Sequence, residues 1–159
     1  MEQADIKIVK GFSSLFYGTA LIAFALDQVS KAMVRAMVPL EGIVPVVPGY
    51  FQIRHTVNPG AAFGLFPDAG PFLVGVAIIA CWLFLRIGRR GFPKRRLAVS
   101  FGMMLGGAVG NLTDRLFRGA VTDFLDFVVW PVFNLADTFL TLGAFGAIVW
   151  SLKGEASSS

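Results

Sequence analysis

Four apolar segments, at about residues 12–36, 71–87, 97–112 and 134–152, constrain this chain more than any other feature. Each approaches the roughly 17–25 residues that a helix needs to cross a bilayer. Only 15% of the residues are charged, whereas a soluble domain has about 25%. We therefore predict an all-α integral membrane protein with four transmembrane helices and a small extracytoplasmic β-rich segment. Residues 1–159 are expected to form a single membrane domain.

The first apolar segment allows two interpretations. Lys7 and Lys10 precede an apolar run and an Ala23-Phe24-Ala25 triplet, an order typical of secretory signal peptides. Because three further apolar segments follow, an uncleaved first helix is the better prediction. Within it, Asp27 and Lys31 are spaced i, i+4 and can form an ion pair, either at the outer interface or as an interior anchor near a site.

Residues 37–70 are expected to form an outer β-rich region, because five prolines exclude a long helix. Phe51–Asn58 alternates apolar and polar residues, which predicts a half-exposed strand. The only histidine, His55, has no metal-ligand partner at a recognisable spacing, so we interpret it as an ordinary strand residue. Asn58, Pro59 and Gly60 then favour a turn. This turn needs no function, although the Asn58 amide could hold an extended peptide.

A cluster of basic residues sets the expected orientation. Six of the fourteen lie in a short loop at about residues 86–96. Between apolar helices, such a cluster indicates a cytoplasmic loop rather than a nucleic-acid site. Both termini then lie in the cytoplasm, and residues 37–70 and 113–133 lie outside. The six residues are Arg86, Arg89, Arg90, Lys94, Arg95 and Arg96.

The third apolar segment carries glycines at four-residue spacing, Gly102, Gly106 and Gly110. Such spacing lets neighbouring helices approach closely in lipid. A dense polar set follows, with four of the ten acidic residues of the chain between 114 and 137. Charged groups at membrane depth are costly, and they tend to be paired and functional.

Elimination leaves carboxylates as the candidate catalytic groups. The chain has no HExxH motif and one histidine, and no Gly-x-Ser-x-Gly lies near that histidine. Two aspartates sharing a proton can activate water if they converge from different elements. On one continuous helix, Asp123 and Asp137 would be about 21 Å apart. Pro131 and a chain reversal can bring them together, although Asp126 could replace Asp123.

Asp137 also follows Asn134 by three residues, the spacing of a helix N-cap and its first turn. The helix dipole there favours the ionised carboxylate. The sequence leaves open whether Asn134 and Asp137 do more than cap the fourth helix.

Five motifs now stand in order along the chain: Asp27–Lys31 (DQVSK), Asn58–Gly64 (NPGAAFG), Gly110–Arg115 (GNLTDR), Val121–Phe124 (VTDF) and Phe133–Asp137 (FNLAD). With them, the chain closely resembles the lipoprotein signal peptidases (signal peptidase II), which are bacterial intramembrane aspartic proteases. Two departures are minor: the segment between the aspartates is shorter than in many members, and Gly64 stands where serine is often found.

The resemblance implies an endopeptidase that removes the signal peptide from diacylglyceryl-modified prolipoproteins, just before the lipidated cysteine. It implies a monomer in the bacterial plasma (inner) membrane with its active site near the outer face. Membrane lipid is an expected partner, nucleic acid is not, and neither a metal nor an organic cofactor is implied. The 51–57 strand could pair with an extended substrate. Asp123 and Asp137 would be the catalytic dyad, supported by Asp27, Lys31, Asn58, Gly60, Asn111, Arg115 and Asn134.

The rival hypothesis is a small ion-coupled transporter or a non-enzymatic membrane subunit. Transporters place ionisable groups near the bilayer midplane and often contain internal repeats. Here the acidic residues gather at one expected face of the membrane, and no repeat is visible.

Overall fold

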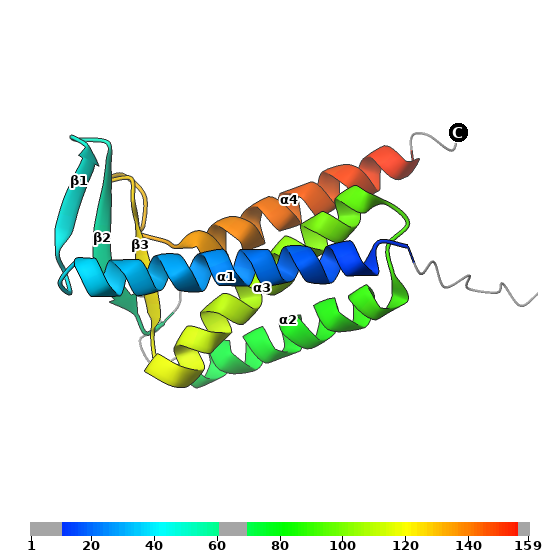
Figure 1. Ribbon diagram of the computed structural model, residues 1–159, viewed down its shortest axis with the longest axis horizontal. Coiled ribbons are helices and arrows are strands. Elements are labelled where there is room, and N and C mark those ends of the chain that lie inside the picture. The colour runs from blue at the N-terminus through cyan, green and yellow to red at the C-terminus, as the bar shows by residue number, and fades with distance from the viewer. Residues whose placement is uncertain (1–10, 61–69, 156–159) are drawn as a thin grey trace, which may run out of the picture.

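Four helices form a bundle with a small sheet at one end (Figure 1). The computed structural model describes the backbone of residues 11–60 and 70–155. Helix α1 begins and helix α4 ends at the opposite end of the bundle from the sheet (Figure 1). The elements are α1 (Ser13–Met37), β1 (Ile43–Val47), β2 (Phe51–Asn58), α2 (Gly70–Arg90), α3 (Arg95–Arg118), β3 (Val121–Asp126) and α4 (Leu135–Glu155).

Helix α3 packs against the other three helices, and its glycines make this possible. A Cβ atom added to Gly106 would lie 2.5 Å from the carbonyl oxygen of Ala20 in α1. One added to Gly102 would lie 2.7 Å from the carbonyl oxygen of Phe16. Any side chain at these positions would push α1 away, so the predicted close packing of the glycine face is confirmed.

The sheet is antiparallel, with strand order β1-β2-β3. Strand β2 has the bounds that the alternating pattern predicts. Strand β3 was not anticipated: it comes from the segment between α3 and α4 and pairs with β2, with Thr56 opposite Asp123 and Asn58 opposite Val121. This pairing places Asp123 beside the end of β2.

Helix α3 runs to Arg118, well beyond the expected end at residue 112. Gly119 ends it with a φ of 77°, the left-handed region that glycine adopts without strain. Arg115 therefore lies on the last turn of α3 rather than in an outer loop, on the same helix as Asn111. Helix α2 is also longer than expected, so that the basic residues of the 86–96 region lie mainly in the ends of α2 and α3.

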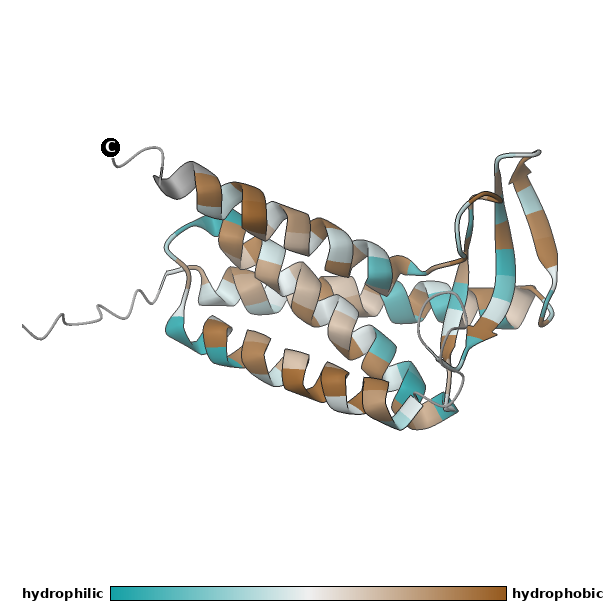
Figure 2. Cartoon of the chain, turned by 180° about the vertical axis from the view of Figure 1, so that it is seen from behind, coloured by the Kyte–Doolittle hydropathy of each residue, from teal (hydrophilic) through white to brown (hydrophobic). Residues whose placement is uncertain are grey.

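Two of the helices are long and apolar enough to cross a membrane by themselves, α2 and the part of α4 from Leu135 to Leu152. Many large apolar side chains on the helices are exposed, including Leu21, Phe72 and Phe145, and such surfaces need an apolar partner. Hydrophilic residues gather at the sheet end and at the link between α2 and α3 (Figure 2). This distribution suits a protein embedded in lipid between two polar layers.

Candidate active site

Asp123 lies in β3 with 3% of its surface exposed, and two side-chain amides hold its carboxylate. The Nδ2 atom of Asn58, in β2, donates to Oδ2 over 3.1 Å. The Nδ2 atom of Asn134 donates to Oδ1 over 2.7 Å. The antiparallel pairing of β2 with β3 brings Asn58 to this position, so the unanticipated strand is what builds this half of the site.

Asp137 lies in the first turn of α4, as its spacing from Asn134 predicts. The backbone N–H of Asp137 donates to Oδ1 of Asn134 over 3.0 Å, which makes Asn134 a true N-cap. The Asn134 N–H lies 3.3 Å from Oδ2 of Asp137. From α3, Nδ2 of Asn111 donates to the other oxygen, Oδ1, over 2.8 Å. Helix capping and a tertiary contact together fix the Asp137 carboxylate.

The two aspartates line the same cavity, which has a volume of about 390 Å³. Arg115, Asn58, Gly60 and Asn111 also line it, so the structure brings most of the expected site residues together. The sequence did not point to the apolar part of the wall, because these residues look like any others in an apolar chain. They are Leu73, Val121, Trp130, Pro131, Val132 and Phe133.

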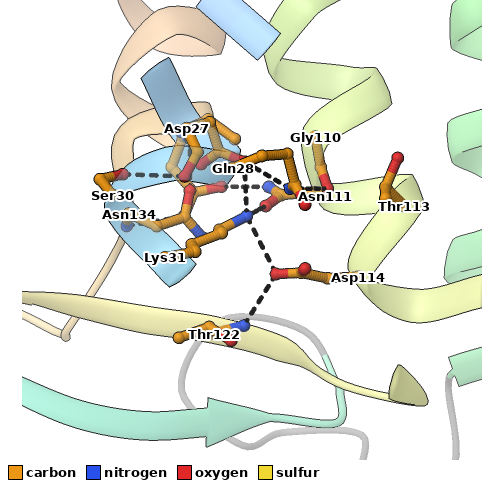
Figure 3. A network of polar contacts seen from close by, with 12 residues as sticks. Asp27, Gln28, Ser30, Lys31, Gly110, Asn111, Thr113, Asp114, Thr122 and Asn134 are labelled. Atoms are coloured by element: carbon orange, nitrogen blue, oxygen red, sulfur yellow. Dashed lines mark hydrogen bonds and ion pairs between the residues drawn. The ribbon is translucent and has the colours of Figure 1, made fainter. Parts of the chain in front are cut away.

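Asp27 and Lys31 lie behind the cavity and are completely buried. Nζ of Lys31 lies 2.9 Å from Asp27 and 3.1 Å from Asp114, and it donates to Oδ1 of Asn111 over 2.9 Å (Figure 3). Asp27 also accepts the Ala136 N–H over 2.9 Å, at the start of α4. Of the two alternatives for this pair, the interior anchor is therefore the one observed.

Asp114 was not among the expected supporting residues, although it joins this network. Its Oδ2 accepts the N–H of Thr122 over 3.1 Å, directly before Asp123 in β3 (Figure 3). The signal was present in the sequence, because a carboxylate one turn from Asn111 on α3 shares its face. Asp114 thus connects Lys31 with the strand that carries Asp123.

Asp126 does not join the cavity lining. Asp123 and Asp126 are three positions apart in one strand, and because successive residues of a strand point to opposite faces, the two side chains lie on opposite faces. Oδ2 of Asp126 instead accepts a 2.7 Å hydrogen bond from Nε2 of Gln52. Of these two aspartates, only Asp123 therefore shares the cavity with Asp137.

The protonation of Asp123 is unusual. Burial raises the pKa of its carboxyl to about 6, and the negative charge of Asp137 acts in the same direction. The hydrogen bonds from Asn58 and Asn134 oppose this shift, because they favour the ionised form. Two neighbouring carboxyls, one of which holds its proton into the weakly acidic range, can act as an acid and a base on one substrate.

Comparison with known proteins agrees with this geometry. A family model described as signal peptidase (SPase) II matches residues 19–153. The chain is 42% identical to a lipoprotein signal peptidase of Moorella thermoacetica, over 84% of this chain and 89% of that protein. It is 41% identical to one of Pelotomaculum thermopropionicum, over 87% and 91%. The chain belongs to the signal peptidase II family.

Solved structures support the same assignment. A bacterial membrane enzyme determined by the in meso method at 2.3 Å resolution superposes with a TM-score of 0.84, at 26% identity over 94% of each chain. A second, at 1.9 Å resolution, gives 0.79 at 27% identity, over 91% of this chain and 96% of that one.

Signal peptidase II is an aspartic peptidase, and the matched range of this chain contains every site residue from Asp27 to Asp137. This chain is therefore an aspartic peptidase of the signal peptidase II type, and the rival hypothesis of a transporter is set aside. The part of the second motif at residues 61–64 lies outside the described residues.

Proposed function

We propose that Asp123 and Asp137 are the catalytic dyad with which this enzyme cleaves diacylglyceryl-modified prolipoproteins just before the lipidated cysteine. The observation that carries the proposal is that both carboxylates line one cavity of about 390 Å³ and that one residue, Asn134, contacts both, Asp123 through its side-chain amide and Asp137 through its backbone N–H. Asp27 and Lys31 act as positioning residues, because they are buried behind the cavity and reach it only through other side chains.

The hydrogen bonds suggest separate roles for the two carboxyls. Asp137 accepts N–H groups at both oxygens and lies at a helix N-terminus, an arrangement that stabilises a carboxylate. It would accept a proton from the attacking water. Asp123 retains its proton at weakly acidic pH and would donate a hydrogen bond to the substrate carbonyl. As the water oxygen bonds to the carbonyl carbon, the Asp123 proton moves to the carbonyl oxygen. When the C–N bond breaks, Asp137 gives the proton that it took from water to the leaving nitrogen, and a hydroxyl of the gem-diol returns its proton to Asp123 as the new carboxyl forms.

Arg115 is suited to hold the substrate main chain. Arg115 lines the cavity, and its buried Nε has no hydrogen-bond partner within the described part of the chain. A guanidinium presents several donors in a fixed plane, which suits peptide carbonyl oxygens. Pairing of the substrate with the 51–57 strand is less suitable than the sequence indicated, because β2 already has β1 on one side and β3 on the other.

The proposed setting is a bacterial plasma membrane crossed by all four helices, with both chain ends and the link between α2 and α3 in the cytoplasm. The cavity lies at the sheet end of the bundle, which would then face outward. A substrate anchored by its lipid would present its scissile bond there without entering the hydrocarbon.

The proposed orientation is tested by cysteine labelling. A cysteine placed at Arg90 in a Cys81→Ser background should react with a membrane-impermeant reagent only from the cytoplasmic side.

The dyad is tested with purified protein and a lipidated precursor. Asp123→Asn and Asp137→Asn should each abolish cleavage and retain substrate binding, because asparagine keeps the size of aspartate but cannot transfer the proton. Asp126→Asn is the matched control, on the same strand but the opposite face, and it should keep most activity. An inactive Asp126→Asn together with an active Asp123→Asn would show that the pairing is wrong.

A further inference from the structure

A second groove, of about 420 Å³, lies between α1, α3 and α4 at the end of the bundle away from the aspartates. Its apolar wall includes Leu15, Val99, Met103 and Leu142. Arg95 and Arg96 line its mouth, about 30 Å along α3 from Arg115 at a rise of 1.5 Å per residue. This groove is therefore separate from the catalytic cavity, and the aspartic peptidase chemistry makes no use of it.

The mouth of the groove carries the positive charges of Arg95 and Arg96. No acidic residue occurs in the sequence between Asp68 and Asp114. Among the residues that the structure describes, neither Arg95 nor Arg96 takes part in an ion pair. At this end of the bundle, hydrophilic residues gather at the link between α2 and α3 (Figure 2). An anion is the ligand that this mouth is suited to accept.

Arg96 is also held in place at the groove. Its guanidinium carbon lies 4.0 Å from the ring centroid of Trp150, in α4. Tryptophan is enriched where helices leave the hydrocarbon for the headgroup layer. The groove thus joins an apolar channel between three helices to a positioned cation at interfacial depth, an arrangement that fits a phospholipid with its phosphate at one end.

We propose that this groove binds one anionic phospholipid of the leaflet opposite the active site. The headgroup phosphate lies against Arg95 and Arg96, and an acyl chain lies along Val99, Met103 and Leu142. Basic pockets between transmembrane helices select anionic headgroups in this way. A zwitterionic lipid would bring its own cation to the two arginines and would bind less tightly.

The test uses full-length protein in detergent, with phosphatidylglycerol or phosphatidylcholine of equal chain length added and bound lipid counted by native mass spectrometry. The double variant Arg95→Gln, Arg96→Gln should bind phosphatidylglycerol at least tenfold more weakly than the unmodified chain. The matched control is the double variant Arg86→Gln, Arg89→Gln, which removes the same charge at the same end of the helix bundle. It also removes an arginine–tryptophan contact, since Arg86 lies 5.2 Å from the Trp82 ring. The control should change the affinity by less than about twofold.

A second measurement separates a lipid from a bare anion or another occupant. Phosphatidylglycerol should raise the thermal unfolding midpoint of the unmodified chain, since a ligand of the folded state stabilises it. The Arg95/Arg96 variant should not show this rise. Inorganic phosphate at equal concentration should not produce it in the unmodified chain. Equal loss in both double variants, equal binding of the two lipids, or an equal rise with phosphate alone would overturn the proposal. So would a lipid-free dimer lost only in the Arg95/Arg96 variant, which would place a second copy of the chain in the groove. None of these readouts depends on cleavage, so they stand apart from the test of the dyad.

Discussion

Asn134 donates a 2.7 Å hydrogen bond from Nδ2 to Oδ1 of Asp123 and, through its own Oδ1, caps the helix turn that carries Asp137. One amide side chain therefore holds the Asp123 carboxylate and the backbone of Asp137, whose own carboxylate lies 3.3 Å from the Asn134 N–H. It is completely buried and does not line the cavity. Under the proposed mechanism, Asn134 would therefore act on the two aspartates and not on the substrate.

Asn134→Ala should lower kcat about 10- to 100-fold and leave KM nearly unchanged, because small displacements of catalytic groups are costly. Loss of the cap should also reduce the free energy of unfolding by about 1 kcal/mol. Thr138→Val is the control: it removes a 3.0 Å hydrogen bond to the Asn134 carbonyl without touching either aspartate, so kcat should stay near that of the unmodified enzyme. Steady-state kinetics with a lipidated peptide measures both parameters, and an unchanged kcat in Asn134→Ala would refute the positioning role.

Several features of the site are readable in the sequence because they are local. The spacing of Asn134 and Asp137 predicts a cap, and the cap is present. The alternation of Phe51–Asn58 predicts β2. The i, i+4 spacing of Asp27 and Lys31 predicts their ion pair, which is 2.9 Å long. In each case the interacting groups lie within one turn or one strand.

The features that could not be predicted from the sequence depend on contacts between residues far apart in the chain. Strand β3 is buried at nearly every position, so it shows no alternation. It pairs with β2, and the side-chain hydrogen bond between Asn58 and Asp123 joins residues that are 65 positions apart. The end of α3 depends on Gly119 rather than on a change in hydropathy. Trp130 and Leu73, in the cavity wall, carry no sequence pattern that distinguishes them from other apolar residues.

Helix packing should depend on the absence of a side chain at Gly106. A Cβ atom there would lie 2.5 Å from the Ala20 carbonyl oxygen and 2.7 Å from the Ala23 Cβ, so Gly106→Leu should separate α1 from α3. We expect a loss of at least about 1–3 kcal/mol, the usual cost of overpacking, and a parallel loss of activity. Gly18→Leu is the control, since no atom lies within 4 Å of its added Cβ. Equal thermal stability of the two variants in detergent would argue against a tight glycine interface.

Lys31 is the buried cation that Asp27 and Asp114 share. Lys31→Met should destabilise the fold by about 3–5 kcal/mol, because two carboxylates would remain buried without their partner. Adding Asp114→Asn to this variant should recover part of the loss. Arg118→Met is the control: Arg118 also approaches Asp114, at 3.5 Å, but its side chain is 48% exposed, so the cost should stay below about 1 kcal/mol. Denaturation in mixed micelles measures all four proteins, and a similar cost for Lys31→Met and Arg118→Met would contradict the buried network.

The pH dependence of kcat/KM should reveal the protonation state of the Asp123 carboxyl. Its pKa of about 6 means that kcat/KM should fall as the pH rises through 6, because the dyad loses the proton that Asp123 donates to the substrate. The folded-state pKa lies above the ordinary value of 3.8. The contribution of Asp123 to stability is therefore full below about pH 4 and is lost as the pH rises through 6.

Asn58→Ala and Gln52→Ala form a matched pair of variants that tests this assignment of the pH profile. Its hydrogen bond to Oδ2 of Asp123 lowers the pKa of that carboxyl, so Asn58→Ala should move the alkaline limb of the kcat/KM profile to higher pH. Gln52→Ala removes an amide from the same strand, but Gln52 bonds to Asp126, and the limb should not move. A shift in both variants, or in neither, would show that the limb does not belong to Asp123, because only Asn58 of the two amides contacts that carboxyl.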